Sequence, residues 1–367
     1  MCKSVLICGK KTKEIKTYFC IMKVNEIYIK RCIQLAKNGF GTTYPNPMVG
    51  SVIVHNNEII GEGWHRKSGE PHAEVKAINS VKDKSLLSKA TIYVSLEPCS
   101  HFGKTPPCCD LIIKHKIPNV VVGTIDPNDK VAGTGIKRLQ ENGIQVTVGI
   151  LEKECYELNK RFFTFHNKKR PYIILKWAES LDGFIAPLTK DKKEPVWISN
   201  VYSRQLVHKW RSEEQTIFVG TNTVLDDNPK LDVRDWTGQN PIRIVLDRTR
   251  KITKDYFIKD EKSKTIIITE QENLTFSENC IYENVIFDSQ LTKNSVRILH
   301  QYGIQSILIE GGKKTLQSFI DDNLWDEARV FIGNIYLKSG ITTPNLNENF
   351  QVKNIKDDQL KLYFNHD

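Results

Sequence analysis

The chain has 367 residues, which is enough for two domains at about 150 residues each. With 40% hydrophobic and 26% charged residues, its composition excludes a wholly disordered or collagen-like protein. No apolar run reaches the roughly 18 residues that a membrane helix needs, so we expect no membrane partner.

The net charge of +10 is concentrated in the N-terminal half of the chain. Residues 1–21 carry five Lys and one Glu, residues 22–168 carry 20 basic and 14 acidic side chains, and residues 169–367 carry 28 of each. A solvated, lysine-rich surface explains this charge. Attraction of anionic substrates or of nucleic acid is the alternative.

Residues 1–21 and the cysteines bear on where the protein works. The segment 1–21 is basic but has no apolar stretch long enough for a secretory signal. We expect a disordered extension with Met22 as the functional start, and organelle import is the alternative. The nine cysteines are odd in number and irregularly spaced, which favours reduced thiols and a cytoplasmic location.

The first part of the chain alternates helix and strand patterns. The predicted helices cover residues 24–38, 72–81, 106–116 and 133–142. The predicted strands cover residues 49–54, 59–64, 90–95, 119–123 and 145–149, with a hairpin turn over 55–58. This order predicts one α/β domain whose helices cover a mostly parallel sheet.

A helical segment over 152–168 leads to the basic residues before Pro171, where we place the domain boundary, near 168–171. A second α/β series follows. Its predicted strands cover residues 171–177, 216–219, 241–246, 264–269, 284–287, 305–309 and 328–337. Its predicted helices cover residues 200–212, 292–302 and 313–322.

The most specific motif is a set of metal-binding residue types in the first domain. His72 and Glu74 are followed by Cys99 after a strand and by Cys108 at a helix start. One His and two Cys ligands hold zinc and leave its fourth position open for water, whose pKa the metal lowers. Glu74 would move protons without ligating the metal, as in zinc nucleobase deaminases. We predict one zinc ion per chain.

The spacing between the two cysteines bears on the substrate. Nucleic-acid editing deaminases usually carry Cys-x-x-Cys, whereas eight residues lie between Cys99 and Cys108. The intervening loop holds His101 and Lys104, which could reach an anionic substrate. Cys109 competes with Cys108 as a ligand but is expected to be a packed neighbour.

These motifs closely resemble the bifunctional riboflavin-biosynthesis deaminase–reductase family over about residues 24–150. The other matching segments are Asn46-Pro47-Met48-Val49-Gly50, Gly63-Trp64-His65, Asp126-Pro127-Asn128 and Val131-Ala132-Gly133-Thr134-Gly135. The resemblance implies a cytidine-deaminase-like three-layer αβα domain. It also implies that 2,5-diamino-6-(5-phosphoribosylamino)pyrimidin-4-one loses its 2-amino group there. The residues it implies for the substrate pocket are Asn46, His65, His101, Lys104, Asp126 and Asn128.

Three segments of the second domain carry chemistry. Lys176 lies on an apolar strand, where a buried lysine could donate a proton or anchor a phosphate. A second segment runs over residues 220–229. The third ends a strand in Glu310-Gly311-Gly312 before a helix, and small residues there let a phosphate approach free N–H groups.

In this order and spacing, the three segments resemble the reductase half of the same family over roughly 171–338. That half has a dihydrofolate-reductase-like fold and transfers hydride from NADPH to C1 of the opened ribose. The resemblance implies Lys176 as a catalytic residue. It implies substrate contacts by Lys176, Arg211, Leu231, Arg234 and Glu310, with Arg211 and Arg234 suited to the phosphate. It implies cofactor contacts by Trp197, Ser199, Thr223, Asp227, Gly312, Lys313, Lys314, Thr315, Leu316, Gln317 and Ser318.

Two positions depart from the family pattern. Pro195 and Arg248 stand where the pattern favours a polar and a small polar residue, and the last 25 or so residues match nothing specific. We predict a zinc- and NADPH-dependent enzyme with residues 22–168 as deaminase and 169–367 as reductase, assembled as a dimer or tetramer. Its substrate would be a small phosphorylated pyrimidine. The alternative is a tRNA or single-stranded DNA base deaminase with an accessory domain.

Overall fold

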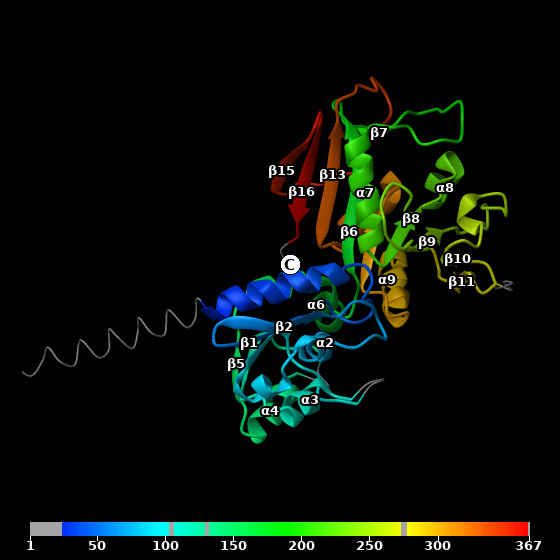
Figure 1. Ribbon diagram of the computed structural model, residues 1–367. Helices are drawn as coiled ribbons and strands as arrows, with labels where there is room; N and C mark the ends of the chain where they lie inside the picture. Colours follow the sequence, from blue (N-terminus) through cyan, green and yellow to red (C-terminus); the bar gives the residue numbers. More distant parts are fainter. Residues whose placement is uncertain (1–23, 103–105, 129–131, 273–276, 366–367) are drawn as a thin grey trace, which may run out of the picture. The chain divides into compact units, whose positions relative to one another are not determined.

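The computed structural model describes residues 24–102, 106–128, 132–272 and 277–365 (Figure 1). It contains two compact units, and the boundary between them falls between Asn167 and Lys168. Within the described ranges, every helix is too short or too polar to cross a membrane. The predicted extension over 1–21 lies outside the described residues.

The first unit alternates helices with short strands. Its helical segments are residues 24–36, η1 (Lys37–Gly39), α2 (Ala73–Ser80), η2 (Lys84–Lys89), α3 (Cys108–Lys114), α4 (Thr134–Glu141), α5 (Glu152–Leu158) and α6 (Lys160–Asn167). Its strands are β1 (Gly50–His55), β2 (Glu58–Trp64), β3 (Thr91–Leu96), β4 (Asn119–Thr124) and β5 (Gln145–Val148).

The five strands form one sheet in the order β2-β1-β3-β4-β5. The hairpin between β1 and β2 is as predicted, because Asn56 and Asn57 both adopt the positive φ that a tight turn requires. The expectation of a mostly parallel sheet is wrong. β1 runs antiparallel to both β2 and β3, and only β3, β4 and β5 are parallel neighbours.

Alternating side chains of the strands bury both faces of this sheet. On one face, Ile92 and Val94 of β3 pack with residues of α2, α3 and α4. On the other face, Tyr93 packs with the helix over 24–36 and with α5. Successive strand residues point to opposite faces, so one short strand serves two cores. The result is the three-layer αβα arrangement expected.

The second unit is built on a larger sheet. Its strands are β6 (Tyr172–Ser180), β7 (Phe184–Ala186), β8 (Thr216–Val219), β9 (Ile242–Leu246), β10 (Thr265–Thr269), β11 (Cys280–Asn284), β12 (Ser306–Ile309), β13 (Glu327–Gly333), β14 (Ile341–Thr342), β15 (Phe350–Ile355) and β16 (Asp358–Phe364). Its helices are α7 (Val201–Glu213), α8 (Thr221–Asp227), η3 (Phe257–Lys259), α9 (Leu291–Gln301) and α10 (Lys313–Asp321).

Nine of these strands form one sheet in the order β11-β10-β9-β8-β12-β6-β13-β16-β15. Neighbours are parallel from β11 to β13, and β16 and β15 extend the sheet antiparallel. Two expectations need correction. The strand predicted over 284–287 ends at Asn284, and the unassigned last residues form the hairpin of β15 and β16.

Helices cover this sheet on both faces. Ile307 and Ile309 of β12 pack on one face with residues of α9 and α10. Leu308, between them, packs on the other face with Val207 and Trp210 of α7. α8 covers a further part through Val224. Ligand sites of such folds lie at the carboxyl ends of the parallel strands, where β8 and β12 lead into α8 and α10.

Candidate active sites

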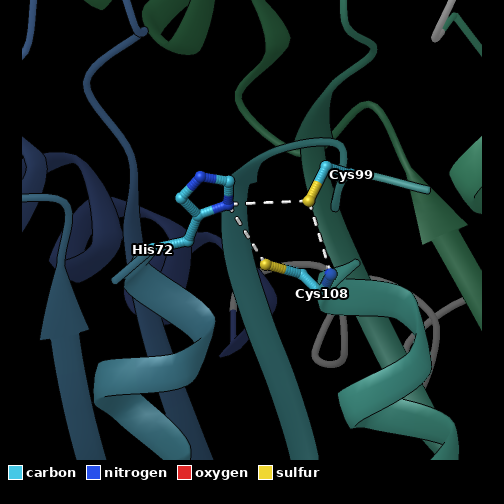
Figure 2. Close-up of side chains that lie close together, drawn as sticks. All are labelled: His72, Cys99 and Cys108. Atoms are coloured by element: carbon cyan, nitrogen blue, oxygen red, sulfur yellow. Dashed lines mark hydrogen bonds between the residues drawn. The ribbon is translucent and has the colours of Figure 1, made fainter. Parts of the chain in front are cut away.

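Three predicted metal ligands meet in the first unit (Figure 2). His72 directly precedes α2, Cys99 follows β3, and Cys108 begins α3. The Nδ1 atom of His72 lies 3.5 Å from Sγ of Cys99 and 3.3 Å from Sγ of Cys108. All three ligand atoms lie within 4.8 Å of one another.

These distances fit a tetrahedral zinc ion. Bonds of about 2.3 Å to sulfur and about 2.0–2.1 Å to nitrogen separate the two ligand atoms by about 3.5 Å at a tetrahedral angle. Three protein ligands also correspond to a catalytic zinc site, because structural sites use four. Cys109 does not compete, since its wholly buried thiol donates to the carbonyl oxygens of Pro98 and Gly135.

Glu74 lies in the first turn of α2, two residues after the ligand His72, and is 3% exposed. Burial raises the pKa of its carboxyl to about 7, and the negative charge of Cys99 adds to this shift. The pKa of Cys99 falls to about 4 because its sulfur accepts a hydrogen bond from the Cys108 thiol. The same hydrogen bond raises the pKa of Cys108. The site therefore combines a metal-ligand set with a carboxyl group that can hold a proton.

A second buried carboxylate, Glu97, organises the loops around the metal ligands. Its Oε1 accepts hydrogen bonds from the backbone N–H groups of Gly135 at 2.9 Å and Ile136 at 3.2 Å. Its Oε2 accepts from the N–H groups of Gly133 at 2.9 Å and Asp126 at 3.3 Å. Two residues before Cys99, this side chain thus joins the ligand loop to the start of α4. Sequence analysis assigned no role to Glu97, although its position two residues before the predicted ligand Cys99 was a signal.

The structure describes five of the six substrate residues predicted for this unit. Asn46 and His65 contact each other at 3.1 Å through Nδ2 and Nε2, and the His65 ring packs edge-on against that of His72. Asp126 is half-buried and accepts a hydrogen bond from the backbone N–H of Asn128 at 2.8 Å. His101 is exposed. The predicted Lys104 lies outside the described residues.

The second unit contains a cavity of about 570 Å³ at the carboxyl edge of its sheet. Nine of the predicted reductase-site residues line it. They are Lys176, Trp197, Ser199, Arg211, Thr223, Asp227, Leu231, Arg234 and Glu310. Residues from β6, α7, α8 and the end of β12 therefore converge on one space, as expected of a single binding site.

A buried ion-pair cluster lies among the residues that line this cavity. Nε and Nη2 of Arg211 donate to the two carboxylate oxygens of Glu310 at 2.7 and 2.8 Å, and Nη1 donates to the Asp232 carbonyl at 3.2 Å. Nζ of Lys176 lies 3.6 Å from Glu310. Burial raises the pKa of Glu310, but Arg211 and Lys176 outweigh it and lower that pKa to about 2. Burial lowers the pKa of Lys176.

This cluster adds a role to the one expected of Arg211. Its guanidinium group has five N–H donors, and three of them are used here, two toward Glu310. Arg211 can therefore hold Glu310 in place and still offer two N–H donors to a phosphate. Arg234 also has an acidic neighbour, since its Nη1 lies 2.7 Å from Asp232.

The predicted cofactor segment begins beside α8. A Cβ atom at Gly312 would lie 3.3 Å from Oγ1 of Thr223, and one at Gly220 would lie 2.6 Å from Oγ1 of Thr315. Glycine is thus needed at position 220, so that the chain after β8 can approach α10 closely.

Farther along α10, the helix turns the predicted cofactor side chains in different directions. The Leu316 side chain is wholly buried in the core with Phe319, so the predicted cofactor contact of this residue would be made by its backbone. Gln317 donates to Asp321, and Ser318 donates to the carbonyl oxygen of Lys314. Lys313 donates to Thr342.

Two further predicted residues have notable surroundings. Asp227 forms an ion pair with Lys190, which sequence analysis did not single out. Leu231 is buried at the cavity wall with φ of 54°. A leucine rarely adopts this left-handed conformation, and such strain concentrates at ligand sites.

Sequence analysis missed two side chains that line the cavity and one that holds the start of α7. Arg204 and His208 line the cavity from α7, on the same helix face as Arg211. Their spacing of four and three residues was a signal that could have found them. Asp358 of β16 accepts hydrogen bonds from the backbone N–H of Asn200 at 2.8 Å and from Oγ of Ser203 at 2.6 Å. The terminal hairpin therefore fixes the start of α7.

Comparison with known proteins finds a matching family model in each unit. Residues 171–362 match a family model described as the RibD C-terminal domain. Residues 22–124 match the cytidine and deoxycytidylate deaminase zinc-binding region. The riboflavin biosynthesis protein RibD of Aquifex aeolicus is 40% identical over 331 residues, which cover 89% of this chain and 91% of that protein. RibD of Escherichia coli is 37% identical, covering 84% and 87%.

Solved structures give the same result over almost the whole chain. The deaminase/reductase from Thermotoga maritima, described as a diaminohydroxyphosphoribosylaminopyrimidine deaminase and 5-amino-6-(5-phosphoribosylamino)uracil reductase, matches with a TM-score of 0.83. It is 36% identical, and the match covers 94% of this chain and 99% of that one. Acinetobacter baumannii RibD matches with a TM-score of 0.83 at 30% identity and the same coverage. The chain belongs to the RibD family of bifunctional riboflavin-biosynthesis deaminase–reductases.

Proposed function

We propose that this chain catalyses two consecutive reactions of riboflavin biosynthesis. The first unit hydrolyses the 2-amino group of 2,5-diamino-6-(5-phosphoribosylamino)pyrimidin-4-one. The second reduces the ribosyl chain of the resulting uracil to ribityl with NADPH. The observation that carries the proposal is the ligand triangle of His72, Cys99 and Cys108 with Glu74 buried beside it. We assign the deaminase to residues 22–168 and the reductase to residues 169–367.

In the deaminase site, His72, Cys99 and Cys108 would hold the zinc ion. Bound zinc supplies Lewis acidity, which makes water a nucleophile near neutral pH. The Glu74 carboxylate would take one proton from the attacking water and pass it to the ring nitrogen. It would then carry the second proton of that water to the amine, which leaves as ammonia while the new carbonyl forms. Asn46, His65, Asp126 and Asn128, with His101 and Lys104, orient the pyrimidine.

In the reductase site, Lys176 and Glu310 would face the reacting ribose. NADPH supplies the hydride when bound. The Lys176 ammonium, held 3.6 Å from Glu310, donates a hydrogen bond to the substrate oxygen that becomes an alcohol. Arg211 keeps the Glu310 carboxylate in place by its two hydrogen bonds. The cofactor would contact Trp197, Ser199, Thr223 and Asp227. It would also contact the segment from Gly312 to Ser318, apart from the Leu316 side chain.

We extend this proposal to the partners of the chain. The substrate is a small phosphorylated pyrimidine and not a nucleic acid, and the chain forms a dimer or tetramer. Light scattering after size-exclusion chromatography measures the number of chains in the assembly. The cytoplasmic location stays a prediction.

A coupled assay tests the two-site proposal. The purified chain is given the diaminopyrimidine phosphate with NADPH, and ammonia release and NADPH oxidation are measured separately. Glu74→Gln should abolish ammonia release, because an amide cannot move the proton. The same variant should still oxidise NADPH when the uracil intermediate is supplied.

The matched control is Glu58→Gln, which changes an exposed carboxylate at the first residue of β2 in the same unit. It should leave both rates unchanged. Equal loss of both activities in Glu74→Gln would contradict two independent sites. Absence of both reactions in the unaltered chain would contradict the proposed function itself.

A further inference from the structure

One cation of the reductase cavity stands apart from the others. Arg204 lies in the first turns of α7, and it lines the same cavity as His208 and Arg211. Seven residues separate Arg204 from Arg211, which is two helical turns or about 10.5 Å along the axis. The cavity therefore presents guanidinium groups at two separate levels of one helix face.

The three arginines that line the cavity differ in their partners. Arg211 is held by the Glu310 carboxylate, and Arg234 lies against Asp232. Arg204 has no ion pair with any residue that the structure describes, and its buried Nε has no hydrogen-bond partner among them. A buried donor without an acceptor costs about 1–3 kcal/mol, so it needs a reason to be kept.

The contact that Arg204 does make orients it for a ligand. Its guanidinium carbon lies 4.2 Å from the centre of the Trp197 ring, which is itself 52% exposed. Stacking uses the face of the planar guanidinium and leaves its N–H donors directed outward in the plane. An acceptor with several oxygens in that plane satisfies the donors, and phosphate does so in bidentate fashion.

We propose that Arg204 binds a terminal phosphate monoester in the reductase cavity, with Trp197 holding its guanidinium plane. This role rests on the proposed function, in which two ligands of the cavity carry such a group. One is NADPH, through its 2′-phosphate, and the other is the substrate, through its phosphoribosyl chain.

Equilibrium binding to the full chain tests the role and identifies the source. Isothermal titration calorimetry compares NADP⁺ with NAD⁺, and ribose 5-phosphate with ribose. Arg204→Gln should weaken the phosphorylated member of one pair by about 10- to 100-fold, since a hydrogen bond to a charged group contributes about 1.5–3 kcal/mol. Binding of the unphosphorylated member should change less than about twofold, because it makes no contact with Arg204. A loss confined to NADP⁺ would identify the cofactor as the source of the phosphate, and a loss confined to ribose 5-phosphate would identify the substrate.

Two further variants keep the test decisive. Arg250→Gln removes an exposed arginine that also lies over an aromatic ring, that of Tyr282, and is outside the cavity lining. It should leave both pairs unchanged. Arg204→Lys keeps the charge but loses the planar fork, and should give an intermediate loss confined to the same ligand. If Arg204→Gln does not fold, this variant decides.

Equal weakening of both members of a pair, or no change in either pair, would overturn the role of Arg204. NADPH oxidation by the unaltered chain is measured alongside. Its absence would count against the proposed function, whereas the four titrations judge Arg204 independently of turnover.

Discussion

Replacing the buried Glu310 by glutamine should strongly destabilise the reductase unit. The carboxylate lies between Arg211 and Lys176, and its side chain is 7% exposed. A pKa lowered from 4.5 to about 2 corresponds to about 3 kcal/mol of extra stability when the group is ionised. Removal of one partner from a buried ion pair typically costs about 3–5 kcal/mol, so two independent arguments agree.

The pH dependence follows from the direction of this shift. Because the folded-state pKa lies below the unfolded value, the contribution is fully present above about pH 4.5 and is lost as the pH falls toward 2. The difference between the unaltered chain and Glu310→Gln should therefore decline from about 3 kcal/mol at pH 7 to about 2 kcal/mol at pH 3.5.

Urea unfolding followed by tryptophan fluorescence measures this difference, because five of the six tryptophans lie beyond residue 167. Glu348→Gln, at an exposed carboxylate of the same unit, is the control and should change stability by less than about 0.5 kcal/mol. A loss below about 1 kcal/mol for Glu310→Gln, or a loss independent of pH, would refute the reasoning.

Three other predictions concern the metal site and the loops that position each site. Each carboxylate oxygen of Glu97 accepts two backbone N–H groups, and Glu97→Gln replaces one of these oxygens by an amide nitrogen. It should lower stability by about 1–3 kcal/mol and slow ammonia release without affecting NADPH oxidation; an unchanged rate of ammonia release would contradict this. Asp358→Asn should weaken the hydrogen bonds at the start of α7 and raise the KM of the reductase reaction only. A reductase KM equal to that of the unaltered chain would show that Asp358 does not position the reductase site. A zinc chelator should stop ammonia release while reduction of the uracil intermediate continues, and elemental analysis should find about one zinc per chain; a metal-free chain with full deaminase activity would exclude the assigned site.

Local patterns predicted the metal site because its ligands are set by short segments. His72 and Glu74 share one helix start, and each cysteine lies at the end or start of a regular element. The hairpin of β1 and β2 was equally predictable, since Asn56 and Asn57 tolerate the positive φ of its turn.

Other features depend on contacts between distant segments. β15 lies at the sheet edge with almost every residue exposed, so its sequence carries no alternating apolar pattern. The residues after Asn284 are apolar, and for this reason the strand was predicted over 284–287, whereas β11 ends at Asn284. Arg204 can be recognised only once the ring of Trp197 and the cavity are in place, and Asp358 lies 158 residues from Asn200.

The capping of α7 by Asp358 bears on the order in which the two activities arise during synthesis. Every described deaminase residue precedes the unit boundary at Asn167, whereas Asp358 follows that boundary by about 190 residues. At about 5–20 residues per second, a ribosome needs roughly 10 to 40 s to make that stretch. During this interval the deaminase unit can already be complete, while the start of α7 still lacks its carboxylate cap. A nascent chain would thus gain its hydrolytic activity first and its reductive activity only when the terminal hairpin has joined the sheet.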